Sequence, residues 1–357
     1  MQLEESKNPA YSYEKKKLQE GAEKKMNKPF PVLGFDIGGT KIAICLAMSD
    51  GTVVASGRVD NKMKKPDEVL PQVVAEGERI LASAGVTKQQ LRAIGISSPS
   101  PMDFEKGLIC NPCNLNGWID VPIRDYLGKA FETEAFFDND ANGAGLAEWF
   151  FGAGKGTQDM IYLTMSTGIG GGIIAGGKLL RGKHNLAGEV GHMSLDGNGL
   201  KCNCGLIGCY EAYCGGVAMA NNLRRELAGK PESMIVQLAG GDYEKIDAIC
   251  LEKAIRAKDA YALEFWDRVM DRNAQAMGAL INIFNPEMIV LGTIVKSMGP
   301  LFMDPLMAKL PKYTWPQNIA ACKFAVTGLS GRSGGELAGA AIALNFLYER
   351  GDWKLPW

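Results

Sequence analysis

The chain has 357 residues and a formal net charge of −1 at pH 7. This near-neutral balance gives no electrostatic reason to expect a nucleic-acid partner, and no apolar run approaches the roughly 20 residues of a membrane span. The length is too great for one compact core and predicts two domains. Nine cysteines without a secretory leader indicate a reducing, cytoplasmic environment. Residues 1–30 are polar and lysine-rich, so we expect a flexible arm.

Apolar periodicity then predicts alternating strands and helices. Strands are expected over 32–35, 42–48, 52–59, 93–97, 135–138, 160–165, 173–175, 288–291 and 324–327. Helices are expected over 67–83, 263–284 and 334–348, with a further helix from the Asn139-Asp-Ala-Asn142 motif through Phe151. Two units of strand, glycine turn and strand, about 130 residues apart, indicate an internal duplication. We therefore expect an α/β fold with two similar halves.

One loop places an imidazole and three thiols within eighteen residues. Zinc takes four such ligands at tetrahedral angles, and a Cys3His set closes its shell without a water position, as in structural sites. The alternatives are unrelated thiols or a disulfide, but two cysteines one residue apart are badly placed to bridge each other. We predict a structural Zn²⁺ site with the ligands His192, Cys202, Cys204 and Cys209.

Two glycine-rich turns carry groups suited to a nucleotide. In Asp36-Ile-Gly-Gly-Thr-Lys41, backbone N–H groups can approach phosphates, and the side chains add a carboxylate for Mg²⁺, a hydroxyl and an ammonium. A lone Gly-Gly turn is more often only a tight hairpin. The second copy, Ser166-Thr-Gly-Ile-Gly-Gly-Gly172, makes phosphate binding the better interpretation.

Several acids lie near these turns in the expected fold. Asp140 sits where a strand ends and a helix begins, where it could act only as a helix cap. Strand ends in α/β folds also line ligand crevices. Glu189 and Glu211 flank the metal loop. Such groups converging on one cleft suit a polyhydroxylated ligand, because sugar hydroxyls need acceptors and donors at fixed angles.

Four motifs resemble those of the ROK family of sugar kinases and, within it, the bacterial glucokinases. They are Asp36-Ile-Gly-Gly-Thr-Lys41, Asn139-Asp-Ala-Asn142, Ser166-Thr-Gly-Ile-Gly-Gly-Gly172, and Ala187-Gly-Glu-Val-Gly-His192 with the following Cys-x-Cys-Gly-x-x-Gly-Cys-x-Glu211. The resemblance implies an α/β, actin-like ATPase (ribonuclease H-like) fold of two domains that close over a cleft. It implies a small domain of residues 31–138 with about 340–357, and a large domain of residues 139–339 that carries the zinc loop.

The resemblance also implies ATP-dependent phosphorylation of the 6-hydroxyl of a hexose, with Asp140 as the general base. His192 would serve both Zn²⁺ and the sugar, with one ring nitrogen for each. A homodimer formed through the zinc-bearing domain is the implied assembly. The implied sugar contacts are Asn114, Asn139, Asp140, Glu189, His192 and Glu211. The implied contacts to ATP and Mg²⁺ are Asp36, Gly38, Gly39, Thr40, Lys41, Thr167, Gly168 and Gly292.

Two segments depart from the family pattern. Leu291-Gly292-Thr293 keeps only the first of the two glycines usual at the end of the nucleotide-side strand. Ser97-Ser-Pro-Ser-Pro101 is richer in serine than the sugar-contacting turn often found at this place. Asn114-Leu-Asn-Gly-Trp118, by contrast, looks like the glucokinase form of the next loop and favours glucose, although Asn114 could be an ordinary loop residue.

Three alternatives stay open. A kinase for N-acetylmannosamine or N-acetylglucosamine could use the same acids. A sugar-binding protein without catalysis is disfavoured, because the acids and the phosphate-turn residues are all present. Transcriptional repressors of the same family carry a DNA-binding domain of several tens of residues before the first hairpin, whereas about 30 residues precede Val32 here. The balanced charge also argues against a regulator.

Overall fold

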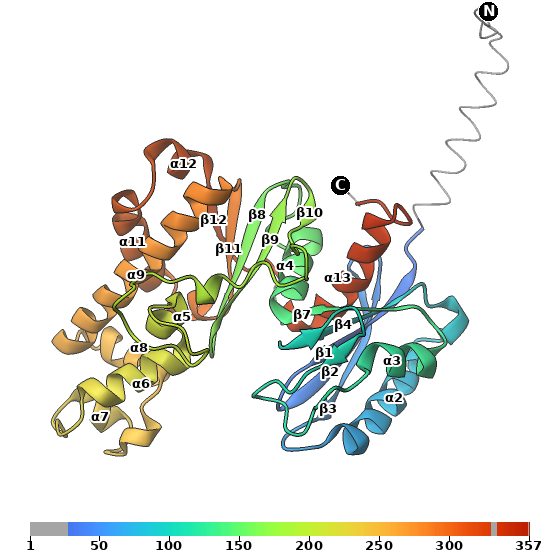
Figure 1. The fold of residues 1–357 in the computed structure, drawn as a ribbon, viewed down its shortest axis with the longest axis horizontal. Coiled ribbons are helices and arrows are strands. Elements are labelled where there is room, and N and C mark those ends of the chain that lie inside the picture. Colours follow the sequence, from blue (N-terminus) through green and yellow to red (C-terminus); the bar gives the residue numbers. More distant parts are fainter. Residues whose placement is uncertain (1–27, 330–333, 356) are drawn as a thin grey trace, which may run out of the picture.

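The computed structural model describes residues 28–329, 334–355 and 357, so the expected N-terminal arm lies almost wholly outside the described residues. The described chain forms two lobes, each built on a five-stranded sheet with helices against it (Figure 1). None of the described helices is both long enough and apolar enough to cross a membrane.

The first sheet has the strand order β3-β2-β1-β4-β7. An antiparallel meander of three strands, as expected from the sequence, is extended by two parallel strands. The strands are β1 (Pro31–Ile37), β2 (Lys41–Met48), β3 (Val53–Asp60), β4 (Ile94–Ser98) and β7 (Ala135–Asn139). Helices α2 (Pro66–Ser83) and α3 (Ile123–Phe131) pack on this sheet, and β5 (Met102–Asp103) with β6 (Leu108–Ile109) forms a small separate hairpin.

The second sheet repeats the same plan in the order β10-β9-β8-β11-β12. Here too an antiparallel hairpin is followed by two parallel strands. This equivalence confirms the internal duplication that the paired glycine turns predict. The strands are β8 (Met160–Met165), β9 (Ile169–Ala175), β10 (Lys178–Leu179), β11 (Met288–Leu291) and β12 (Lys323–Val326).

The second glycine turn is shorter than the sequence suggests. The turn comprises only residues 166–168, and the glycines at 170–172 lie within β9, which corrects the expected turn over 166–172. Helix α4 (Asp140–Phe151) packs directly on this strand. A Cβ atom on Gly172 would lie 2.9 Å from the carbonyl oxygen of Ala141, so close helix–strand packing requires glycine there.

Two helices lie against each other between the sheets, α4 on the second sheet and α13 (Gly334–Glu349) on the first (Figure 1). Glycine also allows α13 to lie close to β4, since a Cβ atom on Gly339 would lie 2.7 Å from the carbonyl oxygen of Gly95. Helix α13 packs on β1 and β4 of the first sheet as well as on α4, and the expected division of the chain into two domains stays a prediction.

Most buried apolar side chains form three clusters. One lies between the first sheet and the helices α2 and α3. Another lies between the second sheet and the helices of the large lobe. The third surrounds α4 and α13 and includes both Val32 of the first sheet and Val290 of the second. This shared cluster joins the two lobes.

The remaining helices build the large lobe. The longest, α9 (Ala260–Phe284), begins after the cap Asp259, whose side chain accepts a hydrogen bond from the N–H of Ala262. It ends at Asn285, whose φ of +44° is the left-handed conformation of a helix end. The others are α5 (Tyr210–Cys214), α6 (Gly216–Glu226), α7 (Met234–Leu238), α8 (Ala248–Arg256), α10 (Ile294–Met298), α11 (Pro300–Lys309) and α12 (Pro316–Ala321).

Candidate active site

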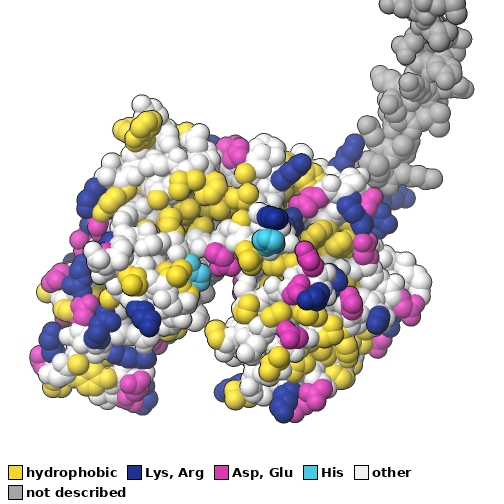
Figure 2. All heavy atoms as spheres, viewed as in Figure 1, with side chains coloured by type: hydrophobic (Ala, Val, Ile, Leu, Met, Phe, Trp, Pro, Cys, Tyr) yellow, Lys and Arg dark blue, Asp and Glu magenta, His cyan; other side chains and the backbone are white. Residues whose placement is uncertain are grey.

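A deep notch separates the two lobes on the face seen in Figure 2, and basic and acidic side chains are intermixed over that face. A cavity of about 350 Å³ is lined by residues of both lobes. All the expected sugar-binding residues line it, namely Asn114, Asn139, Asp140, Glu189, His192 and Glu211. Thr167 and Gly168 of the second glycine turn line the same cavity. The fold therefore gathers residues from segments nearly 100 positions apart.

Asp140 is the first residue of α4, and its neighbour Asn139 is the helix cap. The Asn139 side-chain oxygen accepts hydrogen bonds from the N–H groups of Ala141 and Asn142 at 2.8 and 3.2 Å. Asn139 is therefore the cap, while Asp140 lines the cavity and its Oδ1 also accepts a hydrogen bond from the N–H of Ala141 at 2.8 Å. The residue is open to solvent on the cleft side, but protein atoms on its other sides desolvate the carboxylate and raise its pKa to about 6, and the negative charge of Glu189 adds to the rise.

The serine-rich segment 97–101, which includes the end of β4, forms two hydrogen bonds to residues of the site. The Ser100 hydroxyl accepts a hydrogen bond from the Asn139 amide at 3.1 Å. The Ser97 hydroxyl donates to the Asp36 carboxylate at 2.9 Å. Burial raises the pKa of Asp36 to about 6, and the charge of Asp140 contributes. A carboxylate whose pKa is raised by a neighbouring acid suits a divalent cation, which would favour both carboxylates in their charged form.

The first glycine turn follows β1 and carries the expected phosphate residues. Its shape is closed by a hydrogen bond from Gly38 N–H to the carbonyl oxygen of Lys41 at 3.1 Å, and by the Asn61 amide, which donates to the Gly38 carbonyl at 2.7 Å. Thr40 and Lys41 are exposed. A side chain on Gly39 would collide with the carbonyl group of Asn114, so the sugar-side loop rests directly on this turn.

The expected adenosine contact, Gly292, directly follows β11 and donates its N–H to the carbonyl oxygen of Leu163 at 2.9 Å. The next residue, Thr293, has a φ of +48°, a conformation that favours glycine, where the sequence departs from the family's double glycine. Thr293 also lines a mainly apolar pocket of about 200 Å³ between α6, α8, α9 and α10. Met219, Ile255 and Trp266 contribute to its walls.

The four expected metal ligands are brought together by two short turns. Their ligand atoms all lie within 4.8 Å of one another. The sulfur atoms of Cys204 and Cys209 are 3.7 Å apart, and Nδ1 of His192 is 4.0 Å from the sulfur of Cys202. Two thiolates on a tetrahedral zinc ion are separated by roughly 3.8 Å, given Zn–S bonds of about 2.3 Å. The donor set and its spacing therefore fit Zn²⁺.

Sequence reasoning missed several residues that line the cavity. Asn142 lines the cavity although it was not among the expected sugar contacts, and its side-chain oxygen is buried without a hydrogen-bond partner among the described residues. Asn185 and Gly188 belong to the loop before Glu189 and have φ values of +56° and +92°. The signal that could have found them is an asparagine and a glycine close together just before a candidate acid.

Comparison with known proteins places the chain among relatives of known class. The model of the ROK family matches residues 32–345. A glucokinase of Thermotoga maritima is 34% identical over 319 residues, which cover 89% of this chain and 98% of that protein. The structure of a ROK hexokinase from Thermus thermophilus has a TM-score of 0.78 and 31% identity, covering 90% of this chain and 100% of that one. A ROK family glucokinase from Streptomyces griseus, in complex with glucose and AMPPNP, has a TM-score of 0.70 and 27% identity, with 88% and 99% coverage.

Proposed function

Because this chain belongs to the ROK family and has its two-lobed, actin-like ATPase fold, we propose that it is a sugar kinase. The reaction is transfer of the γ-phosphoryl group of ATP to the 6-hydroxyl of a hexose, with glucose as the preferred substrate. The observation that carries the proposal is one cavity in which Asp140, Glu189 and Glu211 meet the second glycine turn. The glucokinase relatives support the choice of glucose.

In this mechanism Asp140 accepts the proton of the 6-hydroxyl as the sugar oxygen bonds to the γ-phosphorus. The bond between that phosphorus and the β,γ-bridging oxygen breaks, and ADP leaves with its electron pair. Phosphoryl transfer has a loose transition state, so positioning and charge neutralisation supply most of the acceleration. A pKa of about 6 keeps Asp140 mostly ionised at neutral pH while it remains a better base than an ordinary carboxylate.

The two proposed metal ions, Mg²⁺ and Zn²⁺, would bind at separate sites. Mg²⁺ would be held by ATP and by Asp36, which the Ser97 hydroxyl orients. Zn²⁺ would be held by the Cys3His set and would supply structural stability. Because Nδ1 of His192 faces the thiols, Nε2 is left for a sugar hydroxyl. Binding the imidazole at one nitrogen would fix its tautomer and orientation.

The nucleotide would lie along the glycine turns and end in the apolar pocket beside Thr293. Helix α6 links these regions, because its first N–H groups donate to the carbonyl oxygens of Ser166 and Thr167 while Met219, further along it, lines the pocket. A volume of about 200 Å³ with apolar walls suits a flat base. We propose this pocket for the adenine ring.

A coupled ADP-release assay with Mg-ATP and a panel of hexoses tests the proposal. Turnover with glucose well above that with mannose, fructose, N-acetylglucosamine and N-acetylmannosamine is the expected result. Turnover only with an acetamido sugar would keep the chemistry and change the substrate. No turnover with any sugar, from folded and metal-loaded protein, would overturn the kinase proposal and favour a sugar-binding protein. The homodimer and the cytoplasmic location stay predictions.

A further inference from the structure

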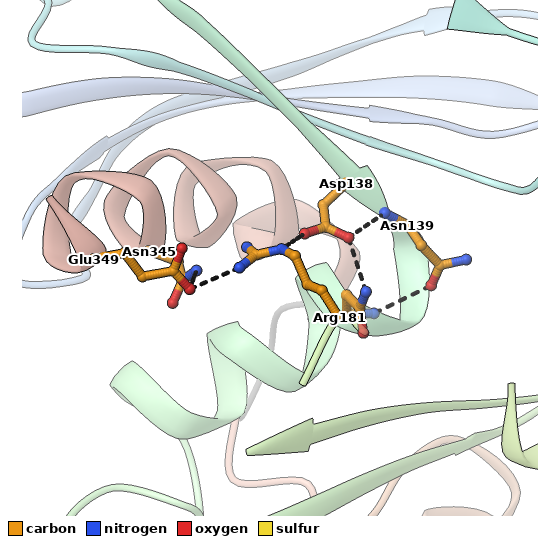
Figure 3. Close-up of polar contacts among 6 residues, drawn as sticks. Asp138, Asn139, Arg181, Asn345 and Glu349 are labelled. Atoms are coloured by element: carbon orange, nitrogen blue, oxygen red, sulfur yellow. Dashed lines mark hydrogen bonds and ion pairs between the residues drawn. The ribbon is translucent and has the colours of Figure 1, made fainter. Parts of the chain in front are cut away.

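A buried arginine just outside the cavity joins three parts of the chain (Figure 3). Arg181 follows the edge strand β10, and its side chain is 13% exposed. Its Nε donates to Oδ2 of Asp138 at 2.9 Å, and its Nη1 donates to Oε1 of Glu349 at 2.6 Å. Asp138 lies near the end of β7 and Glu349 is the last residue of α13. One guanidinium thus holds the edges of both sheets and the C-terminal helix.

The side chain of Asp138 connects Arg181 to one wall of the sugar cavity through hydrogen bonds. It is fully buried, and its Oδ1 accepts hydrogen bonds from the N–H of Asn139 and from the amide of Asn142, both at 2.8 Å. These two residues flank Asp140 on the first turn of α4. Since the carboxylate is held on its other oxygen by Arg181, the start of the helix is fixed relative to β10.

The backbone of Arg181 forms a hydrogen bond to the loop on the opposite wall of the cavity. Its carbonyl oxygen accepts a hydrogen bond from the N–H of Ala187 at 3.0 Å, which closes the loop that carries Asn185 and leads to Glu189 and His192. The same residue therefore holds the proposed base by its side chain and the loop of sugar contacts by its main chain.

The remaining contacts limit how far the guanidinium can move. Its central carbon lies 4.6 Å from the ring centre of Phe346, and Asn345 donates to the same Glu349 oxygen at 2.9 Å. Its Nη2 is buried without a hydrogen-bond partner among the described residues. Buried ion pairs contribute little net stability, and a buried donor without a partner costs stability. A role in geometry accounts for the network better than stability does.

We propose that Arg181 is a positioning residue that sets the distance between Asp140 and the sugar-binding groups Glu189 and His192. The inference rests on the proposed sugar-kinase function. Arg181 does not line the cavity, and among the described residues its hydrogen bonds and ion pairs do not involve the first glycine turn or Gly292. Its loss should therefore disturb the use of the sugar and leave ATP binding nearly unchanged.

The test compares Arg181→Gln with Arg350→Gln. Arg350 is a matched control because it also lies at the end of α13, pairs with an acid beside β7 (Glu134, 2.8 Å) and packs over an aromatic ring (Phe136, 5.3 Å), but it is 43% exposed and remote from the cavity. In Arg181→Gln we expect kcat/KM for the hexose to fall about 100-fold, with the KM for ATP changed less than about twofold. Arg350→Gln should match the wild type in both.

Two further variants keep the test decisive if Arg181→Gln does not fold, and melting curves show whether each variant is folded. Arg181→Lys keeps the positive charge but cannot form both hydrogen bonds, and Glu349→Gln weakens only the bond to the partly exposed partner. Both variants should lower kcat/KM for the hexose, by less than Arg181→Gln does. The inference would be overturned if any folded variant of this network had the same kinetics as Arg350→Gln. It would also be overturned if the KM for ATP rose as much as the KM for the hexose. If Arg181→Gln and Arg181→Lys both fail to fold, Glu349→Gln decides by the same criterion. Absence of hexose turnover in the wild type would instead refute the proposed function.

Discussion

The carboxylate of Glu211 accepts a hydrogen bond from the backbone N–H of Ile169 at 2.8 Å. Glu211 lies on α5 in the sugar-binding wall, and Ile169 begins β9 directly after the second glycine turn. A side chain on Gly168 would collide with this carboxylate, so glycine is required where the two meet. One acid thus connects the proposed sugar site to the proposed phosphate site.

Substitution of Glu211 should separate these two roles. Glu211→Gln removes the charge but keeps an oxygen that can accept from Ile169, so the KM for the hexose should rise by about tenfold and the KM for ATP should stay near the wild-type value. Glu211→Ala removes both, so both KM values should rise. Steady-state kinetics with each substrate varied provide the measurement. Equal effects of the two substitutions on the KM for ATP would contradict the connection.

Asp140→Asn should lower kcat by about 10²–10⁴-fold, the usual contribution of a general base. The hexose should still bind with near wild-type affinity, because the amide retains one acceptor oxygen. The coupled assay and calorimetric titration measure the two quantities. Asp125→Asn, an exposed acid on α3, is the control and should have no effect. Turnover of Asp140→Asn within tenfold of the wild type would refute the assigned role.

The activity should depend on pH through the same residue. Since burial raises the pKa of Asp140 to about 6, the base becomes protonated as the pH falls through that value. The kcat/KM for the hexose should be constant above about pH 7 and should fall below about pH 6, tenfold per unit for one required carboxylate. A slope of two would add Asp36, whose pKa is also about 6. A profile that is flat down to pH 4.5 would exclude a required carboxylate with a pKa of about 6.

Loss of one metal ligand should lower both zinc content and stability. Cys204→Ser replaces an exposed member of the Cys3His set, and the bound zinc should fall from about one ion per chain to well below that. The melting temperature should fall by several degrees, because metal binding stabilises the folded state. Cys113→Ser changes an exposed cysteine outside the set and serves as the control. Atomic absorption and melting curves provide the data; equal zinc content in the two variants would remove Cys204 from the site.

Thr293→Gly should raise the free energy of unfolding by about 1 kcal/mol, because a β-branched residue is strained at a φ of +48°. Lys65→Gly is the control, since Lys65 is also an exposed residue before a helix without a side-chain cap, but its φ is −82°. That control should be neutral or slightly destabilising. Denaturant unfolding of both variants tests the difference, and destabilisation by Thr293→Gly would show that the threonine side chain is needed there.

The sequence by itself determined most of the longer strands and the first glycine turn, because these follow from local periodicity and glycine placement. The meander that begins at Val32, the long helix expected over 263–284 and the spacing of the four metal ligands could all be predicted in this way. The motif residues around Asp140 and Glu211 were also identifiable, because their order along the chain matches a known family.

Only the tertiary structure decided which groups meet. Helix α4 on β9 explains the glycines at 170–172, which local pattern had assigned to a turn. Asn139, and not Asp140, proved to be the cap, since that depends on backbone conformation at one residue. Arg181 lies 43 residues from Asp138 and 168 from Glu349, and no local pattern connects them. Such contacts depend on how the two sheets pack around α4 and α13, which a linear pattern of polar and apolar residues does not encode.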